Sequence, residues 1–502
     1  MTDIRRIGGL LAAALAWAPT AALADDACGA LAEPGRFPQT TVASAAAMEP
    51  DPQRGLPAYC EVTGTIRPVP GSEIGVVYRL AAAWNGKLLG IGGGGMAGNV
   101  KLETAAPNLA RGYATAQTDM GHASPDALDP SWALAAPGQL NEERVIDFGH
   151  RATHLMTVTG KEMVRAYYGR AQSRAYWEGC STGGRQGLME MQRYPDDYDG
   201  VIAGAPVYNM LVYTTAVLRT QHFHARPGSN LTPGQVQLLS RAVLKVCDAQ
   251  DGVEDGIVGD PRQCKFDPAV LQCKSAGGED CLSTQQVETV HRMYQGVQTA
   301  DGRTAAAPLL PGGEPDWLTR SVGNERMKLG LNSLLGAPFI SYLVKMDPGY
   351  NLFSFDPNKD VDEAERSFAR RQIAATDADL GAFFGRGGKL ILWHGFNDPG
   401  PSPIQTLKYY EEVAAKAGGA VDDRARLFFV PGVYHCRGGP GTDKFDALGA
   451  LDDWTEKGTA PARILATRAD RKLSRPLCPY PQLARYNGSG DPNDAASFSC
   501  AP

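Results

Sequence analysis

Several features that would place this chain of 502 residues in other protein classes are absent from it. It has no long basic run and its formal net charge is −6, so we do not expect a nucleic acid as a partner. No apolar run reaches the roughly 20 residues that a transmembrane helix needs, and we expect no membrane association. Low-complexity tracts and internal repeats are also missing. A globular chain remains, long enough for one large domain with an insertion or for two domains.

Residues 1–24 have the pattern of a signal peptide. Two arginines precede the apolar residues 7–17, and a small-x-small cleavage pattern ends at Ala24. No cysteine follows the cleavage point directly, so a lipid anchor is not indicated. The sequence therefore predicts a protein that is secreted or periplasmic after cleavage near Ala24.

Ten cysteines follow the cleavage point. An even number in an exported chain predicts disulfides rather than reduced thiols. The Cys-x-x-Cys spacing of zinc knuckles is missing, so zinc binding by thiolates is not expected. The ten are Cys28, Cys60, Cys180, Cys247, Cys264, Cys273, Cys281, Cys436, Cys478 and Cys500.

The run Gly179-Cys180-Ser181-Thr182-Gly183 contains Gly-x-Ser-x-Gly, the pattern of a turn that carries a nucleophilic serine between a strand and a helix. The flanks fit this interpretation, because residues 173–178 predict a strand and residues 185–193 a helix. The alternative is a glycine-rich loop that contains a serine by chance. The strand and the helix on either side favour Ser181 as a nucleophile.

The other two residues of a catalytic triad are expected in the order acid, then histidine. His435 follows a predicted strand on a Pro-Gly loop, the position of the base. Asp398 lies on the exit loop of the preceding predicted strand, the position of the acid. His394 is an alternative base, but its acid would then have to come from an inserted segment. Asp422 and Asp423 are alternative acids, although they have the pattern of a solvated surface turn.

A tetrahedral oxyanion needs at least two preorganised hydrogen-bond donors. We expect one to be the backbone N–H of Thr182, which follows the nucleophile. The second is expected from the glycine turn at residues 92–95, which comes directly after an apolar strand, and Gly95 is the preferred donor. A flexible loop is the alternative interpretation of this turn.

Cys180 precedes the predicted nucleophile, and Cys436 follows the predicted base. If Ser181 and His435 meet in space, these two thiols must also be close, and they would oxidise in an exported protein. The bridge would close a long loop, with a chain-entropy stabilisation of about 4–5 kcal/mol.

Strands and helices alternate over residues 60–205, which favours an α/β fold with a mostly parallel, doubly wound sheet. The alternation stops after residue 206 and returns from residue 389 onward. We expect the segment between to form a lid over the carboxyl ends of the strands, where active sites of open α/β sheets lie. The predicted domains are a catalytic domain of residues 25–206 and 385–502 and a lid domain of residues 207–384.

Several segments match one known family. They are Gly179-Cys180-Ser181-x-Gly183-Gly184-Arg185, Tyr198-Asp199-Gly200-x-x-Ala203-Gly204-Ala205-Pro206, His394-Gly395-x-x-Asp398 and Val430-Pro431-Gly432-x-x-His435-Cys436-x-Gly438-Gly439-Pro440-Gly441. On these residues the chain resembles the tannase and feruloyl esterase family over nearly all of the mature sequence. The resemblance implies an α/β-hydrolase fold and the triad Ser181, Asp398 and His435. It also implies the disulfides Cys28–Cys60, Cys180–Cys436, Cys247–Cys264, Cys273–Cys281 and Cys478–Cys500.

An acidic loop in the expected lid is a candidate metal site. Asp248, Asp251 and Asp255 lie at short spacing with interleaved glycines, which suits calcium. The terminal Glu of an EF-hand is missing, and the spacing on its own slightly favours a solvated acidic turn. The family resemblance implies a structural Ca²⁺ held by the three Asp side chains and by the carbonyls of Val253 and Ile257. No organic cofactor is expected.

These residues together predict a secreted serine carboxylic-ester hydrolase that works through an acyl-enzyme. The resemblance implies a small aromatic-acid ester of feruloyl or galloyl type as substrate. The lid offers aromatic side chains as apolar walls for a ring, namely Trp317, Phe339, Tyr342, Phe353 and Phe355.

Three further functions fit the same residues. A terephthalate-monoester hydrolase needs a lid cation for the free carboxylate of its substrate. Residues 332–341 contain no arginine, and the candidates elsewhere in the lid are Arg320, Arg326 and Lys345. A non-catalytic binding protein would keep the scaffold without turnover, and an acyltransferase would pass the acyl group to an alcohol in place of water.

Overall fold

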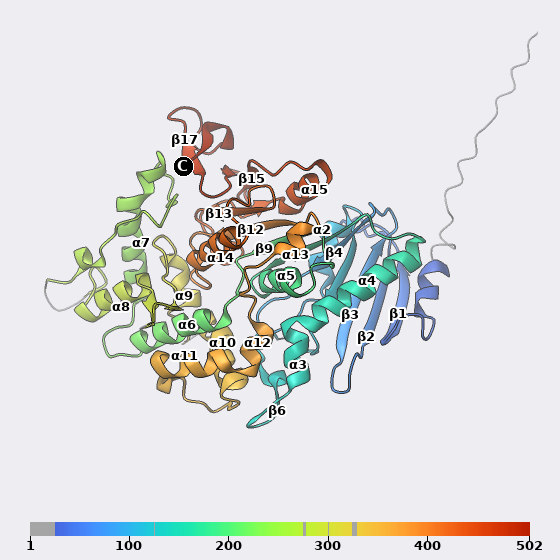
Figure 1. The fold of residues 1–502 in the computed structure, drawn as a ribbon. Coiled ribbons are helices and arrows are strands. Elements are labelled where there is room, and N and C mark those ends of the chain that lie inside the picture. The colour runs from blue at the N-terminus through green and yellow to red at the C-terminus, as the bar shows by residue number, and fades with distance from the viewer. Residues whose placement is uncertain (1–25, 125, 275–277, 300, 324–328) are drawn as a thin grey trace, which may run out of the picture.

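A nine-stranded sheet runs through the centre of the structure (Figure 1). The structure is a computed structural model, and it describes residues 26–124, 126–274, 278–299, 301–323 and 329–502. The expected signal peptide lies outside the described residues. The strand order is β1-β2-β3-β5-β4-β8-β9-β12-β13, antiparallel from β1 to β5 and parallel from β5 to β13. The strands are β1 (Thr40–Met48), β2 (Tyr59–Ile66), β3 (Ile74–Ala81), β4 (Lys87–Ile91), β5 (Ala114–Thr118), β8 (Arg174–Cys180), β9 (Gly200–Gly204), β12 (Lys389–Gly395) and β13 (Ala425–Val430).

Each face of the parallel half of the sheet carries its own apolar core. Neighbouring residues of one strand belong to different cores: Trp177 and Leu390 to the first, Tyr176 and Ile391 to the second. Burial on both faces explains why these strands are almost continuously apolar. Helices cover both faces, which confirms the predicted doubly wound α/β sheet. The first face packs on α4 (Ala152–Tyr168), α5 (Thr182–Arg193) and α14 (Pro403–Lys416), and the second on α2 (Leu102–Leu109) and α15 (Ala447–Lys457).

Residues 142–168 are helical throughout and contain one π-helical turn. Helix α3 (Glu142–Ile146) continues into this turn at Asp147–Arg151, which continues into α4 at Ala152. The buried guanidinium of Arg185 donates to two carbonyl groups of this turn, at 2.8 and 2.9 Å. A π-helical turn displaces carbonyls from the regular hydrogen-bond ladder, and Arg185 supplies the donors that they need.

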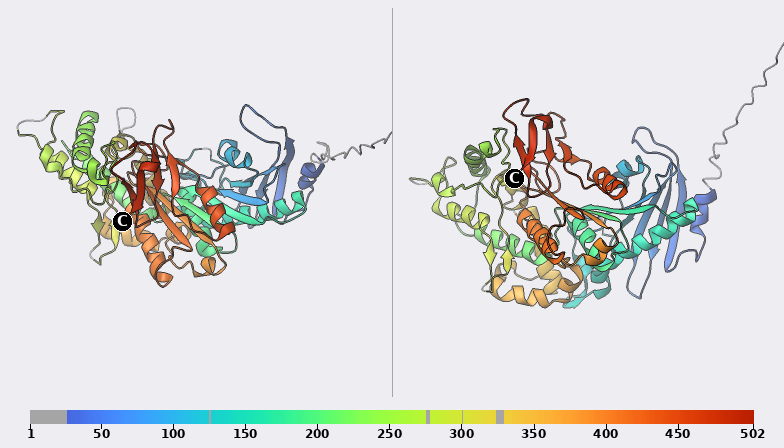
Figure 2. Two further views of the ribbon diagram at one scale, coloured as in Figure 1. Left: turned by 90° about the horizontal axis from the view of Figure 1, so that it is seen from above. Right: turned by 45° about the horizontal axis from the view of Figure 1, so that its top comes forward.

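The described part of residues 207–384 is mainly helical and has one short hairpin. Most of it lies at the opposite end of the molecule from β1 (Figures 1 and 2). Its last part differs, because Phe383 and Phe384 pack into the core under the sheet. The elements are α6 (Met210–His224), α7 (Pro233–Cys247), α8 (Thr284–Tyr294), β10 (Val297–Gln298), β11 (Thr304–Ala306), α9 (Trp317–Arg320), α10 (Leu331–Pro338), α11 (Pro357–Arg366), α12 (Phe368–Ile373) and α13 (Gly381–Gly385).

All ten cysteines are paired, and the pairs are those that the family resemblance implies. The bridges are Cys28–Cys60, Cys180–Cys436, Cys247–Cys264, Cys273–Cys281 and Cys478–Cys500. The last of them joins β17 and β18 to the small C-terminal strands. Short strands outside the main sheet are β6 (Leu134–Ala136), β7 (Gln139–Leu140), β14 (Lys444–Phe445), β15 (Ile464–Thr467), β16 (Ser474–Leu477), β17 (Leu483–Tyr486) and β18 (Phe498–Ala501).

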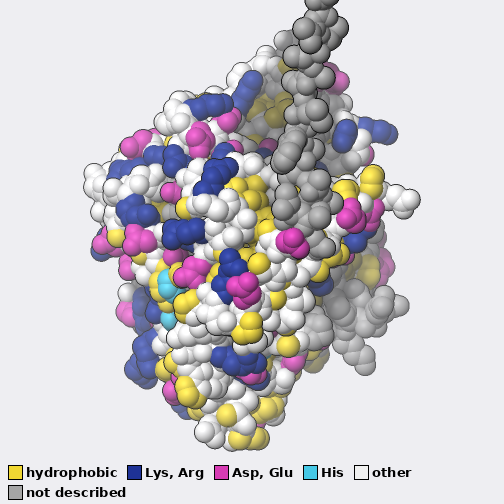
Figure 3. All heavy atoms as spheres, turned by 90° about the vertical axis from the view of Figure 1, so that its right-hand side faces the viewer, with side chains coloured by type: hydrophobic (Ala, Val, Ile, Leu, Met, Phe, Trp, Pro, Cys, Tyr) yellow, Lys and Arg dark blue, Asp and Glu magenta, His cyan; other side chains and the backbone are white. Residues whose placement is uncertain are grey.

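Charged side chains of both signs are interspersed on the face of the molecule that carries β1 (Figure 3). Within the described ranges, no helix has the length and apolar character to cross a bilayer.

Candidate active site

Ser181 lies in the sharp turn between β8 and α5. Its backbone has φ +63° and ψ −119°, a left-handed conformation that residues other than glycine rarely adopt. Its N–H donates to the carbonyl of Gly204 at the end of β9 (2.9 Å). A Cβ on Gly179 would lie 2.5 Å from the backbone of Gly183, so only glycine allows the strand and the helix to approach this closely. A turn of this geometry places a serine hydroxyl at the carboxyl edge of the parallel strands.

Asp398 and His435 lie on the loops that follow β12 and β13. His435 Nδ1 is 2.6 Å from Asp398 Oδ2, and the Asp398 side chain is fully buried. Burial acts to raise the pKa of Asp398, but the neighbouring His435 and His394 outweigh it and hold the pKa well below its usual value. The ionised carboxylate can only accept, so Nδ1 donates and Nε2 is left to take a proton from a serine hydroxyl.

His394, the alternative base, is a second partner of the same carboxylate. Its Nε2 lies 3.1 Å from Asp398 Oδ2 and 3.0 Å from the Pro401 carbonyl, while its Nδ1 lies 2.7 Å from Thr406 Oγ1. Two acceptors at Nε2 place the ring proton there. The imidazole is completely buried, so it cannot reach a substrate. His394 therefore orients Asp398, a role that its spacing in the sequence did not indicate.

The Cys180–Cys436 disulfide joins the serine turn to the histidine loop. The two Cα atoms are 6.1 Å apart although the cysteines are 256 residues apart in the chain. Cys436 also has a left-handed backbone, with φ +64°. Because each cysteine is the chain neighbour of Ser181 or His435, the bridge fixes how far apart these two residues can lie.

The glycine turn after β4 packs against the first residue of α5. Thr182 Oγ1 donates to the carbonyl of Gly95 (2.7 Å), and no acceptor among the described residues faces the Gly95 N–H. The N–H of Gly93, in contrast, is already bonded to Gln186 Oε1 (2.8 Å). A Cβ on Gly95 would lie 3.0 Å from Leu335 Cδ2, which places α10 directly over this turn. The structure thus brings together Thr182 and Gly95, the two residues expected to stabilise an oxyanion.

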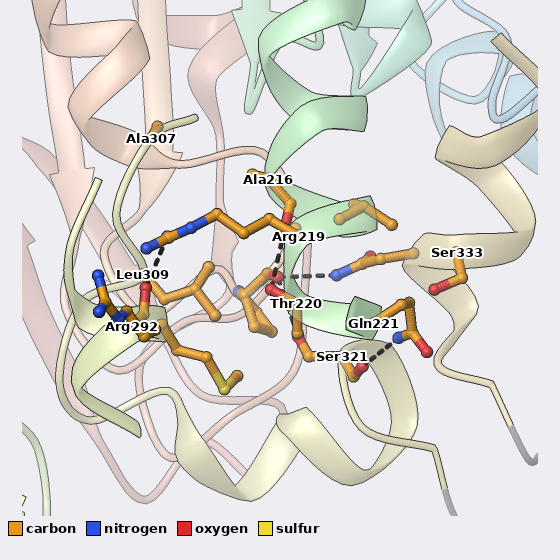
Figure 4. A pocket seen from close by; sticks show the side chains of 14 residues that line it. Ala216, Arg219, Thr220, Gln221, Arg292, Ala307, Leu309, Ser321 and Ser333 are labelled. Atoms are coloured by element: carbon orange, nitrogen blue, oxygen red, sulfur yellow. Dashed lines mark hydrogen bonds between the residues drawn. The ribbon is translucent and has the colours of Figure 1, made fainter. Parts of the chain in front are cut away.

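The inserted segment also contacts the loop of Asp398. Asn332 Nδ2 donates to the Pro399 carbonyl (2.7 Å), and Asn397 Nδ2 donates to the Pro311 carbonyl (3.1 Å). A small pocket lies between α6, α10 and this loop (Figure 4). Sequence reasoning did not find Asn397, although it lies next to Asp398. Its amide joins the lid, the acid loop and the histidine loop, since Oδ1 accepts from the N–H of Gly432 (2.7 Å).

Asp316 is a further ionisable group close to the triad. Its carboxylate binds Arg320 Nε at 3.0 Å, and both side chains are more than four-fifths buried. Burial raises the pKa of Asp316 to about 6; Arg320 opposes this rise, and the charge of Asp398 adds to it. The guanidinium of Arg320 is therefore already paired within the protein.

Three of the five aromatic side chains expected as substrate walls are instead part of the lid interior. Trp317 and Phe339 are completely buried and Phe355 is 4% exposed. A side chain that water cannot reach cannot line an open cavity. Phe353 is 57% exposed and Tyr342 half-buried. The sequence could not separate core from cavity here, because both use the same residue types.

The acidic loop follows α7 directly. The Asp248 carboxylate accepts backbone N–H groups at 3.0–3.3 Å, and Asp255 is paired with Arg475. Burial raises the pKa of Asp251 to about 6, and the charges of Asp255 and Asp248 contribute in the same direction. The loop thus offers oxygen donors whose mutual repulsion a cation would relieve, which fits calcium in kind. Asp255 would have to exchange Arg475 for the ion.

A different group of side chains could hold a metal ion. His154, Glu190 and Asp197 offer three ligand atoms within 4.8 Å of one another, the only such group in the part of the chain that the structure describes. Sequence reasoning missed the group, because its members are brought together only by the packing of α4 on α5.

The mostly parallel sheet, the serine turn and the Asp398–His435 pair define the chain as a member of the α/β-hydrolase class. A family model described as tannase and feruloyl esterase matches residues 60–501. The chain belongs to this family and is a carboxylic ester hydrolase. The family resemblance and the fold class expected from the sequence are thereby confirmed.

Individual relatives cover most of the chain. It is 34% identical to the mono(2-hydroxyethyl) terephthalate hydrolase of Piscinibacter sakaiensis, over 89% of this chain and 85% of that protein. It is 32% identical to a probable feruloyl esterase of Arthroderma benhamiae, over 85% and 82%. The crystal structure of feruloyl esterase B from Aspergillus oryzae superposes with a TM-score of 0.86 at 25% identity, over 95% of this chain and 100% of that chain.

Proposed function

We propose that this chain hydrolyses esters of aromatic acids through Ser181, His435 and Asp398. The observation that carries the proposal is the 2.6 Å bond between His435 Nδ1 and the buried Asp398, on a loop that a disulfide ties to the serine turn. His435 Nε2 takes the proton of Ser181 as Oγ attacks the ester carbonyl, and then passes it to the leaving alcohol. Water, activated by the same nitrogen, releases the acid from the acyl-enzyme. The N–H groups of Thr182 and Gly95 stabilise the oxyanion.

Ser181→Ala tests the nucleophile. The variant should keep the far-ultraviolet circular dichroism of the parent and lose hydrolysis of a chromogenic ester. Ser44→Ala, an exposed serine on β1, is the matched control and should retain full activity. Hydrolysis by Ser181→Ala at the parental rate would rule out the assignment.

Two other functions on this scaffold are separated by direct measurements. A fluorophosphonate should label Ser181 in the folded protein, whereas a non-catalytic binding protein would give no adduct. Hydrolysis in the presence of competing alcohols should yield mainly the free acid. A predominance of transesterified product would identify an acyltransferase.

For the substrate, we propose neutral phenolic esters of feruloyl or galloyl type. Leu335 overlies Gly95, so an apolar side chain borders the expected oxyanion site. Two of the three lid cations named above as candidates for a free carboxylate are already paired: Arg320 with Asp316, and Lys345 with Asp360 and Glu363. Arg326, the third candidate, lies outside the described residues.

The second candidate is hydrolysis of a terephthalate monoester, which the 34% identical relative favours by its name. The two substrate classes differ by one free carboxylate. We expect a higher kcat/KM for methyl ferulate or methyl gallate than for the terephthalate monoester. A highest kcat/KM for the terephthalate monoester would reverse the proposal.

We also propose that residues 207–384 form a lid and that its acidic loop binds a structural Ca²⁺ through Asp248, Asp251, Asp255 and the carbonyls of Val253 and Ile257. The buried, mutually repelling carboxylates support this site. After chelation, added Ca²⁺ should raise the melting temperature of the parent but leave that of Asp251→Asn unchanged. A melting curve indifferent to chelator and to added calcium would contradict the site.

Export is part of the same proposal. The five disulfides support an oxidising compartment, in which structural bridges form and persist. We expect the mature chain, recovered from a host with an intact secretion system, to begin at Asp25. A cytoplasmic product with an uncleaved N-terminus would argue against it.

A further inference from the structure

A second polar group lies away from the catalytic loops, where α4 and α5 meet the chain before β9. His154 comes from α4, Glu190 from α5 and Asp197 from the loop, and their ligand atoms lie within 4.8 Å of one another. Glu190 is 1% exposed and Asp197 5%. The side chain of His154 is 28% exposed, which gives the group a route to solvent.

Glu190 is the member of this group that needs an explanation. Both of its carboxylate oxygens are buried and receive no N–H or hydroxyl donor, and the group within hydrogen-bonding reach is the carboxylate of Asp197. An ionised carboxylate in such surroundings costs several kcal/mol unless a positive charge balances it. The structure places a second carboxylate beside it instead of a cation.

The neighbours of Asp197 do not supply the missing charge. His154 Nδ1 lies 2.6 Å from Asp197 Oδ2, and Lys161 Nζ lies 3.9 Å from Asp197 Oδ1. The ammonium of Lys161 also donates to the carbonyl of Asp196 (3.1 Å). Lys161 therefore balances at most one of the two carboxylates, and Glu190 is left without a counter-ion among the described residues.

We propose that His154, Glu190 and Asp197 bind a divalent transition-metal ion of the zinc class. One imidazole nitrogen with two carboxylate oxygens is a donor set typical of zinc, whereas calcium takes oxygen ligands. Zinc bonds of about 2.0–2.2 Å hold tetrahedral ligand atoms about 3.3 Å apart. The His154–Asp197 contact must therefore widen slightly as the ion replaces the hydrogen bond. The imidazole is already oriented by Tyr194, which stacks on it at 3.8 Å between ring centroids.

The ion has a structural role in this position. It links α4, α5 and the loop before β9, close to the end of the helix that begins directly after Ser181. It also neutralises the buried Glu190. This site differs from the acidic lid loop in location and in chemistry, since the loop offers only oxygen donors.

Metal binding can be measured on the full mature chain without reference to activity. The protein is stripped with a chelator, dialysed, and titrated with Zn²⁺ and with Co²⁺ near neutral pH in a buffer that does not bind metal. We expect one ion per chain and, for Co²⁺, the visible absorption of a low-symmetry nitrogen–oxygen site. Glu190→Gln and His154→Gln should each weaken binding by about tenfold or more.

His291→Gln is the matched control, because His291 forms an exposed pair with Asp267 at 3.2 Å and should bind no specific ion. Its affinity for zinc should equal that of the parent, as should that of Asp251→Asn in the acidic loop. The alternative occupant is a proton shared by Glu190 and Asp197. In that case the stripped parent would take up no zinc at micromolar concentration, and this result would overturn the proposal. Equal zinc affinity in the parent and in both site variants would also overturn it.

Discussion

One carboxylate oxygen, Asp398 Oδ2, faces two imidazoles: His435 at 2.6 Å and His394 at 3.1 Å. The other oxygen accepts the N–H of Gly400 at 2.7 Å. Each additional donor stabilises the ionised form, so Asp398 is held as a weak base. A weaker base attracts the proton of His435 less strongly, and His394 thereby acts on the Asp398–His435 pair from a buried position.

This role of His394 can be tested by comparing two substitutions. His394→Leu removes the donor, which is worth about 1.5–3 kcal/mol for a charge-assisted bond, so kcat should fall by about 10- to 100-fold. KM should change little, because the buried imidazole does not touch the substrate. His394→Gln retains a donor and should recover part of the lost kcat. A parental kcat in His394→Leu, or a loss in KM alone, would contradict this role.

At the residue scale, the sequence indicated Ser181, Asp398 and His435, because a short turn pattern and chain order are local information. It could not indicate Asp316 or Glu190. Each of these acquires its significance from neighbours that only the folded chain supplies, Arg320 in one case and Asp197 in the other.

At the scale of elements, Arg185 connects the serine helix to the π-helical turn before α4. It is completely buried and donates to the carbonyls of Phe148, Gly149 and Ile373. Burial lowers the pKa of its guanidinium to about 9, and no carboxylate compensates for its charge among the described residues. Three carbonyls from two segments therefore depend on one side chain.

Arg185→Met should leave these carbonyls without donors and destabilise the protein by about 3 kcal/mol or more. Arg185→Lys should not restore the loss, since an ammonium lacks the planar fork of donors. The matched control is Arg193→Met on the same helix, whose side chain is more exposed and makes fewer bonds. Denaturant unfolding measures the three free energies. Equal stability of Arg185→Met and Arg193→Met would contradict the prediction.

The Cys180–Cys436 bridge should affect turnover as well as stability. Cys180→Ala with Cys436→Ala frees the histidine loop, including the left-handed backbone at Cys436, and the separation of nucleophile and base becomes variable. We expect kcat to fall more than secondary-structure content. The double variant Cys478→Ala with Cys500→Ala, at a distant bridge, serves as the control and should retain its kcat. Parental turnover without the Cys180–Cys436 bridge would assign it a structural role alone.

Several elements follow from the sequence and others do not. The strand β12 begins at Lys389, where the alternation was predicted to return, since buried parallel strands are continuous apolar runs. The π-helical turn at Asp147–Arg151 was not predicted, because it depends on donors that Arg185 supplies from another helix. Long-range partners of this kind leave no periodic pattern in the sequence.

At the scale of the whole molecule, two sets of buried groups titrate in the same pH range with opposite effects on stability. Burial raises the pKa values of Asp119 and Asp316 to about 6 from 3.8. The folded state then binds more protons than the unfolded state, and stability is lost as pH rises from about 4 to about 6. Burial lowers the pKa values of His150 and His224 to about 4 from 6.5. For these histidines the unfolded state binds more protons than the folded state, so stability is gained as pH rises from about 4 to about 6.

Removing either set of groups should therefore change the slope of melting temperature against pH. Asp119→Asn with Asp316→Asn should make stability rise more steeply between pH values of about 4 and 6 than in the parent. His150→Gln with His224→Gln should make stability fall over this pH range relative to the parent. The measurement is a series of thermal melts in chelator at constant ionic strength. Parallel curves for the parent and both double variants would contradict the assignment.

The break in alternation predicted an inserted segment at residues 207–384, but the contacts of this segment could not be predicted. Helix α10 lies over Gly95, and Asn332 binds the loop of Asp398. Both contacts come from tertiary packing between segments more than 60 residues apart in the chain. The preference for a substrate depends on these contacts, which is why the sequence alone left it open.

The Cys180–Cys436 bridge also has a consequence for biogenesis. A chain delivered from its N-terminus into an oxidising compartment presents Cys180 long before its partner, 256 residues later. Cys247, Cys264, Cys273 and Cys281 arrive in the interval, and their own partners are only 17 and 8 residues away. Cys180 therefore remains a reduced thiol while the Cys247–Cys264 and Cys273–Cys281 bridges can already form. With the proposed export, the Cys180–Cys436 bridge can close only after translocation is nearly complete, so the yield of active protein should depend on a disulfide isomerase that corrects early mispairing.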